Sequence, residues 1–135
     1  MHTVRSPDAA RILVVEDELL VRMFAVDSLE DEGFTVTQAS DAAQALQEIA
    51  AGGANAFTAV VIDLGLPDRS GDQLAAEIRA TDAEVPIVIA SGRSERELKE
   101  RFAGDDAIAL LVKPYTAMLL LDALESLGVR TPAAR

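Results

Sequence analysis

The chain has 135 residues, of which 50% are hydrophobic and 26% charged, the composition of one ordinary globular domain. It has no cysteine and one histidine, His2, so disulfides and thiolate metal sites are excluded and histidine-based catalysis is disfavoured. Its 23 acidic and 12 basic residues give a net charge of −11, a field that repels nucleic acid and anionic membranes. No apolar run approaches the roughly 20 residues that span a bilayer, and residues 1–10 have no secretory signal, so we expect a cytoplasmic protein without nucleic-acid or membrane partners.

Strand-like and helix-like periodicity alternate along the whole chain. Short β-branched runs predict strands, and the segments between them have helical spacing. Gly33 and Gly128 follow two of the helical segments as stop signals, and Pro114 is expected in the first turn of the last helix. The predicted order is strand 11–15, helix 18–32, strand 34–39, helix 41–51, strand 57–62, helix 72–81, strand 86–90, helix 94–103, strand 107–112 and helix 114–127.

Five strand–helix units predict an α/β fold with a five-stranded parallel sheet covered by five helices on both faces. Right-handed crossovers leave few topologies, and the flavodoxin-like, doubly wound strand order 2-1-3-4-5 is the expected one. Such sheets bind ligands at the carboxyl ends of their strands, near the point where the strand order reverses. The residues that follow each strand are therefore the candidates for function.

Polar residues stand at four of these strand ends. Glu16 and Asp17 follow the first strand, Asp63 the third, Ser91 the fourth and Lys113 the fifth. Crowded carboxylates repel one another unless a cation lies between them, and an all-oxygen donor set suits Mg²⁺. With the charge neutralised, a carboxylate can act as the nucleophile toward phosphorus, and a lysine can stabilise the transferring phosphoryl oxygens.

Each of these residues also has an ordinary structural explanation. Glu16 and Asp17 are suited to the N-terminus of a helix, where acids are stabilised by the helix dipole. Asp63 can cap the loop that follows it, Ser91 can belong to a turn, and Lys113 can form an ion pair with a nearby carboxylate. None of these explanations predicts that all five residues meet at one edge of the sheet.

Four segments, taken in order, resemble the receiver domain of two-component response regulators, of the kind found in single-domain regulators. These segments are Ile12–Glu18 (ILVVEDE), Val61–Asp68 (VIDLGLPD) with Gly71, Pro86–Gly92 (PIVIASG) and Val112–Tyr115 (VKPY). The resemblance divides the chain into a flexible N-terminal tail at 1–9, a receiver domain at 10–128 and a short C-terminal tail at 129–135.

The resemblance implies that Asp63 is the phosphoacceptor and that Mg²⁺ is the cofactor. Asp17, Asp63 and the backbone carbonyl of Gly65 are then expected to bind the ion directly, and Glu16 through water. The domain itself is expected not to be an enzyme, beyond assisting its own phosphorylation and dephosphorylation.

The same resemblance gives Lys113 the role of bridging to the phosphoryl oxygens and Ser91 that of a moving hydroxyl that reports phosphorylation. The sequence departs from the family at Leu110, where many members have an aromatic residue that moves with this hydroxyl. The path of the hydrolytic water is expected to pass Gly65 and Arg93, and Gly65 offers no group to orient that water.

The implied phosphodonor is a histidine kinase or a histidine phosphotransfer protein, which in this family is recognised by the first helix, here Leu19–Phe24, Val26 and Asp27. A downstream protein, or a second copy in a homodimer, is expected at the surface formed by the fourth helix, fifth strand and fifth helix. Met118, Leu119 and Leu121 lie partly outside the core stripe of the fifth helix, which fits either such a surface or a broad buried face.

Three alternatives stay open. One is a phosphorylation-independent interaction module with the same fold. Another is an aspartyl-phosphate phosphatase using Asp63, although Gly65 stands where that class has a second aspartate. Finally, we expect a stand-alone receiver, but a piece of a hybrid kinase or of a longer regulator fits the same sequence.

Overall fold

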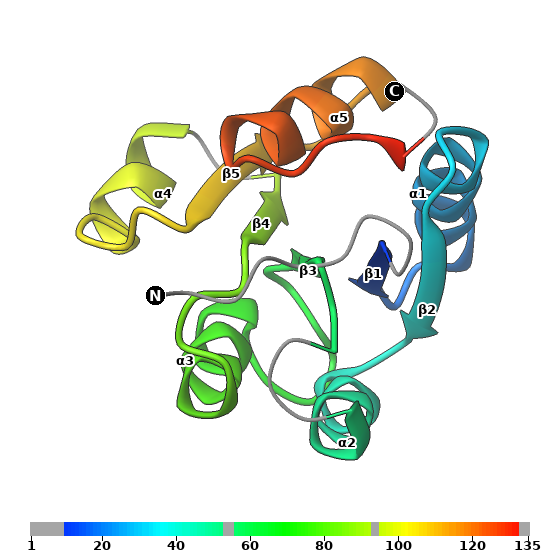
Figure 1. Ribbon diagram of the computed structural model, residues 1–135. Coiled ribbons are helices and arrows are strands. Elements are labelled where there is room, and N and C mark those ends of the chain that lie inside the picture. Colours follow the sequence, from blue (N-terminus) through cyan, green and yellow to red (C-terminus); the bar gives the residue numbers. More distant parts are fainter. Residues whose placement is uncertain (1–9, 53–55, 93–94, 133–135) are drawn as a thin grey trace.

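The computed structural model describes residues 10–52, 56–92 and 95–132, so the expected tail at 1–9 and Arg93 lie outside the described residues. Strands and helices alternate throughout (Figure 1). The strands are β1 (Arg11–Val15), β2 (Thr35–Ala39), β3 (Ala59–Asp63), β4 (Ile87–Ser91) and β5 (Ile108–Val112). The helices are α1 (Leu19–Asp31), α2 (Ala42–Gly52), α3 (Gly71–Thr81), α4 (Glu95–Arg101) and α5 (Ala117–Ser126).

All five strands pair in parallel in the order β2-β1-β3-β4-β5, which confirms the predicted topology. The strand order reverses between β1 and β3. The chain continues from β1 to β2 on one side and from β3 to β4 on the other, so the two connections run in opposite directions and leave room at the carboxyl ends of β1 and β3. In the register, Asp63 of β3 lies opposite Ala90, and Ser91 of β4 lies opposite Val112. The ends of four strands therefore meet at one edge.

Helices cover both faces of the sheet (Figure 1). On one face, α1 and α5 pack on the sheet through Ala25, Leu29, Leu120 and Leu124. On the other face, α2 and α3 pack through Ala42, Ala45, Ile49, Leu74, Ala75 and Ile78. Because both faces are covered, β3 and β4 are buried along their whole length, which explains their continuous apolar sequences. The edge strand β2 is only partly buried, as its alternating sequence predicts.

The last helix starts later than predicted. Pro114 follows a cis peptide bond from Lys113 and lies before α5, which begins at Ala117. Thr116 has extended backbone, and its Oγ1 accepts a hydrogen bond from the Leu119 N–H at 3.1 Å, so it is the N-cap that sets the start of the helix. The prediction of a helix from Pro114 is wrong, because proline suits a loop as well as a first helical turn.

The packed part of the chain continues past Gly128. Val129, which we expected in the C-terminal tail, is buried against the α1–α5 face, and its N–H donates to the Leu124 carbonyl at 3.0 Å. Within the described ranges, no helix combines the length and apolar character that crossing a membrane requires.

Candidate functional site

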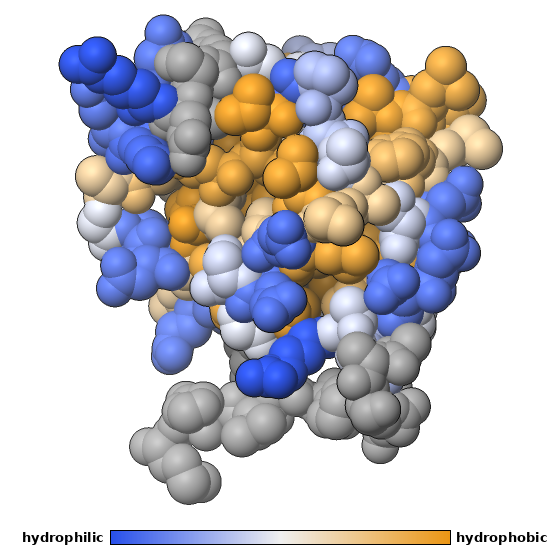
Figure 2. Space-filling model, turned by 90° about the horizontal axis from the view of Figure 1, so that it is seen from above, coloured by the Kyte–Doolittle hydropathy of each residue, from blue (hydrophilic) through white to orange (hydrophobic). Residues whose placement is uncertain are grey.

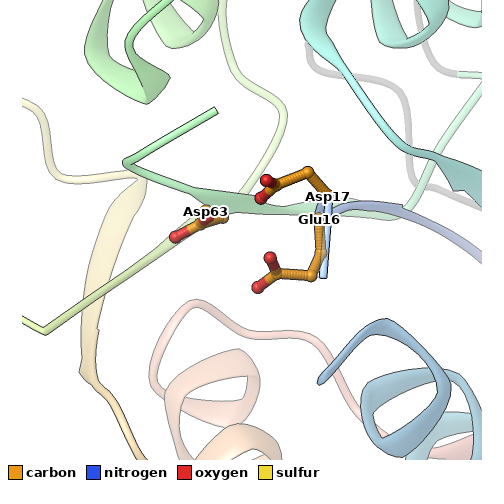
Figure 3. Close-up of side chains that lie close together, drawn as sticks. All are labelled: Glu16, Asp17 and Asp63. Carbon is orange, nitrogen blue, oxygen red and sulfur yellow. The ribbon is translucent and has the colours of Figure 1, made fainter. Parts of the chain in front are cut away.

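Three carboxylates meet where β1 and β3 end side by side. Glu16 and Asp17 directly follow β1, and Asp63 is the last residue of β3. One oxygen from each carboxylate lies within 4.8 Å of the other two, and Figure 3 shows the carboxylates of Glu16 and Asp17 on either side of the chain, turned toward the end of β3. Glu16 and Asp63 are buried whereas Asp17 is exposed, so the cluster opens to solvent at Asp17.

Lys113, the residue that follows β5, bridges this cluster. Its Nζ lies 2.8 Å from Glu16 Oε1 and donates a hydrogen bond of 3.1 Å to Asp63 Oδ1. Burial acts to lower the pKa of Lys113, but the hydrogen bonds to Glu16 and Asp63 outweigh burial and the pKa is raised. The ammonium is therefore charged at neutral pH and fixed beside the Asp63 carboxylate.

One ammonium does not balance three carboxylates. Burial raises the pKa of Glu16, and the negative charge of Asp63 adds to the rise, while hydrogen bonds from Lys113 and from the Glu18 N–H oppose it. Because burial disfavours the charged form of this carboxylate, a further cation nearby would stabilise that form. The donor set is made of oxygens only, which is the set that Mg²⁺ prefers, so the residues present fit this ion.

Ser91 and Gly65 border the cluster on the neighbouring segments. Ser91, the last residue of β4, is buried, and its carbonyl accepts a hydrogen bond from the Lys113 N–H at 2.7 Å. Gly65 lies two residues after Asp63 in the loop that leads to α3, and it is exposed. The structure thus places both at the same edge of the sheet as the carboxylates, and their roles stay predictions.

Gly71 holds the loop after β3 close to the site. Its N–H donates to the Leu64 carbonyl at 2.7 Å. A Cβ on Gly71 would lie 2.7 Å from Leu64 Cα and 2.8 Å from the Asp63 carbonyl oxygen, so any larger residue would push the backbone next to Asp63. The glycine is required for this close backbone approach.

The sequence does not predict the contacts by which Asp68, the last residue of the segment Val61–Asp68, and Arg22 support the site. Asp68 accepts hydrogen bonds of 2.9 Å from both Ala42 N–H and Ala43 N–H, which joins the loop after β3 to the start of α2. Arg22 of α1 donates from Nη1 to the Glu16 carbonyl at 2.8 Å. Neither has a local signal, because the partners of Asp68 lie far away in sequence and Arg22 has the spacing of any exposed helical residue.

The aromatic residue nearest in sequence does not replace the one absent at Leu110. Leu110 is partly buried on the α2–α3 face of the sheet, whereas Tyr115 packs on the α1–α5 face. The Tyr115 ring lies 6.0 Å from that of Phe24 in α1, with an angle of 52° between the ring planes. The two positions thus lie on opposite faces of the sheet.

Comparison with known proteins gives the same family at the level of sequence and of structure. A model of the response regulator receiver domain matches residues 12–125. The transcriptional regulatory protein PdtaR of Mycobacterium tuberculosis is 35% identical over 115 residues, which are 85% of this chain and 55% of PdtaR. The chain therefore spans about half the length of that relative.

Solved structures match over almost the whole chain. A response regulator receiver protein from Sinorhizobium medicae superposes with a TM-score of 0.78 at 32% identity, covering 90% of this chain and 96% of that one. The response regulator TrrA from Thermotoga maritima, whose structure is a complex with Mg²⁺ and BeF, gives a TM-score of 0.73 at 26% identity, covering 87% of this chain and 98% of TrrA.

Proposed function

Because this chain belongs to the response regulator receiver domain family of two-component systems, we propose that it is a switch that accepts a phosphoryl group on Asp63. The observation that carries the proposal is the position of Lys113, whose Nζ lies within hydrogen-bond distance of both Asp63 and Glu16 in a cluster of three carboxylates. We assign this function to residues 10–128.

In the proposed reaction, a carboxylate oxygen of Asp63 attacks the phosphorus of a phosphohistidine. The phosphorus–nitrogen bond breaks, the histidine nitrogen leaves with the electron pair, and an acyl phosphate forms on Asp63. Lys113 is placed to neutralise one of the phosphoryl oxygens, because it already contacts Asp63 Oδ1. The Ser91 hydroxyl at the end of β4 is assigned to a second phosphoryl oxygen, and its movement is the signal.

Mg²⁺ is the proposed cofactor. Asp17, Asp63 and the carbonyl of Gly65 would hold it directly and Glu16 through water, and the exposure of Asp17 leaves the cluster open to an ion from solvent. When bound, the ion supplies positive charge to the carboxylates and to the phosphoryl group. The Mg²⁺ and BeF in the similar structure of TrrA support this assignment.

The phosphodonor is proposed to dock on α1. Leu19, Leu20 and Met23 expose 57%, 80% and 48% of their surface there, which is unusual for large apolar residues on an acidic protein. A groove of about 460 Å³ runs from Leu20 and Phe24 of this helix to Lys113 and Tyr115. A histidine kinase or histidine phosphotransfer protein bound on this face would lie beside the residue that bridges the acidic cluster.

A downstream protein, or a second copy of the chain, is proposed to bind at the surface formed by α4, β5 and α5. Figure 2 views the side of the molecule on which α5 lies in Figure 1, and apolar side chains gather across it between charged ones. A groove of about 560 Å³ here is lined by Phe102, Leu110, Val112 and Leu119, among others. The exposed Met118 and Leu119 favour a surface for binding over a broad buried face.

Intact mass after incubation with Mg²⁺ and a small phosphodonor such as acetyl phosphate tests the proposal. We expect one added phosphoryl group on the wild type, none on Asp63→Asn, and none when the metal is chelated. No addition together with no Mg²⁺ binding would contradict the switch and favour a phosphorylation-independent interaction module. Addition to the Asp63→Asn variant would place the acceptor elsewhere.

A further inference from the structure

We infer that Arg22 is a positioning residue for the proposed metal site, because its guanidinium fixes the peptide that carries Asp17. The inference rests on the proposed Mg²⁺ site. Arg22 lies in the first turn of α1, half-buried, and its side chain reaches back over the loop that joins β1 to this helix. It is not a member of the acidic cluster, and it reaches Glu16 through the backbone carbonyl, so the proposed positioning effect passes through the backbone.

Two hydrogen bonds define the orientation of the Arg22 guanidinium. Nη1 donates to the Glu16 carbonyl oxygen at 2.8 Å, and Nε donates to Gln38 Oε1 at 3.0 Å. Gln38 belongs to β2, whose pairing with β1 is part of the sheet. Arg22 therefore joins the loop to α1 on one side and to the sheet on the other, and a charged donor makes both bonds stronger than neutral ones.

Glu16 is held at each of its other polar groups as well. Its N–H donates to the Ala39 carbonyl at 3.0 Å, Oε1 contacts Lys113, and Oε2 accepts from the Glu18 N–H at 3.1 Å. The carbonyl is the one polar group of Glu16 that depends on Arg22. Removing the arginine leaves the carboxylate in place and frees the peptide plane.

The orientation of this peptide plane sets the position of Asp17. The Glu16 carbonyl and the Asp17 N–H belong to the same planar peptide unit, so a rotation of one moves the other. Asp17 is the exposed member of the carboxylate cluster, and its side chain is reached by solvent. With Arg22 in place, the Asp17 carboxylate is aimed at the cluster before the ion arrives, which lowers the cost of binding.

The test is the Mg²⁺ dissociation constant, measured by titration calorimetry on the full chain. Arg22→Met keeps the length of the side chain and removes the donors, and we expect about tenfold weaker binding, the lower end of what loss of an outer partner of a metal ligand costs. Arg22→Lys retains one donor and should recover part of the affinity. Gln38→Leu removes the second anchor and should give a smaller loss in the same direction.

Arg79 provides a matched control. Its guanidinium donates to the Val85 carbonyl at 2.6 Å and pairs with Asp105 at 3.0 Å, but it does so on α3, away from the acidic cluster. Arg79→Met should lower the melting temperature and leave the Mg²⁺ dissociation constant unchanged. Wild-type affinity in Arg22→Met, or an equal loss of affinity in both variants, would overturn the inference.

The dependence of phosphorylation on Mg²⁺ separates positioning from a general loss of structure. With acetyl phosphate as the donor, which needs no docking on α1, the Mg²⁺ concentration at half-maximal rate should rise in Arg22→Met while the rate at saturating Mg²⁺ approaches that of the wild type. A rate that stays well below that of the wild type even at saturating Mg²⁺ would contradict the inference. A wild type that binds no Mg²⁺ would instead contradict the proposed function itself, so the two failures are distinct.

Discussion

Gly65 has room for a side chain at the edge of the site. Among the described residues, no atom other than those of its chain neighbours lies within 4 Å of a Cβ placed there. From the resemblance to the family, we expect a side chain at this position to orient the water that hydrolyses the acyl phosphate on Asp63. The wild type, with a glycine, should therefore keep its phosphoryl group for longer than a variant that can orient water.

We predict that Gly65→Asn loses its phosphoryl group up to about tenfold faster than the wild type, since one hydrogen bond of about 1.4 kcal/mol in the transition state corresponds to a factor of ten. The decay of the phosphorylated protein is followed by intact mass after the donor is removed. Gly65→Ala, which adds volume without a polar group, is the control and should decay as the wild type does. Faster decay of the wild type than of Gly65→Asn would contradict the prediction.

Gly71, in the same loop, has no such room. Because a Cβ there would lie 2.7 Å from the backbone of Leu64, Gly71→Ala should lower the free energy of unfolding by about 1–3 kcal/mol, the usual cost of overpacking. Urea unfolding measures this loss, and Gly65→Ala is again the control, with expected stability close to the wild type. Wild-type stability in Gly71→Ala would mean that the loop can shift away from Asp63 without cost.

At the level of single residues, the sequence predicts the acidic cluster but not the hydrogen bonds that support it. Glu16, Asp63 and Lys113 follow strands whose ends must meet in a parallel sheet, so their proximity follows from topology alone. Asp68 accepts from N–H groups that lie far away in sequence, and Arg22 donates to a carbonyl in the loop before its helix. Such partners depend on how the loops close, and no spacing in the sequence encodes them.

At the level of the elements, two aspartates accept hydrogen bonds from N–H groups at the N-terminus of α2. Asp41 accepts a hydrogen bond from the Gln44 N–H at 2.8 Å, as a local N-cap. Asp68, from the loop after β3, accepts from the Ala42 and Ala43 N–H groups. These hydrogen bonds hold the pKa of Asp68 below its ordinary value of 3.8, and the bond from the Ala42 N–H has the largest effect. Burial acts in the opposite direction and is outweighed.

The lowered pKa of Asp68 means that its charged form stabilises the folded state. The charged carboxylate is favoured in the folded state, so its contribution is present above pH 3.8 and is lost as the pH falls through the lower folded pKa. We predict that Asp68→Asn unfolds at lower urea than the wild type at pH 6, and that the difference shrinks as the pH falls below about 3.8. Asp106→Asn, at an exposed aspartate before β5, is the control. A difference independent of pH would contradict this account.

Element order and type are predicted correctly throughout the described residues, because the short, continuous apolar runs of the covered strands differ clearly from the period-3.6 pattern of the helices between them. The boundaries follow less directly from periodicity, because capping contacts set them. The start of α5 was misplaced at Pro114, since the bond between Thr116 and the Leu119 N–H decides it and the sequence also allows a proline at the first turn. The order of the strands followed from the short connections and the right-handed crossover rule.

For the whole molecule, a net charge of −11 opposes self-association of two copies. Any homodimer must therefore be stabilised by apolar contacts between the two copies. Raising the salt concentration should favour the dimer, because salt screens the charge repulsion. Among the described residues, the exposed large apolar side chains lie either on α1 or on the surface of α4, β5 and α5. The two proposed partners would occupy these two surfaces separately. A substitution on one surface should thus leave the function of the other intact.

We predict that Met118→Glu and Leu119→Glu remove any self-association that phosphorylation induces, while leaving the free energy of unfolding within about 0.5 kcal/mol of the wild type, because both side chains are exposed. Sedimentation with and without the phosphodonor, at low and high salt, measures the first effect and urea unfolding the second. Leu20→Glu on α1 is the matched control: Leu20 is 80% exposed, so this variant should associate as the wild type does and lose phosphotransfer from a kinase instead. Association that survives Leu119→Glu but not Leu20→Glu would move the contact between copies to α1.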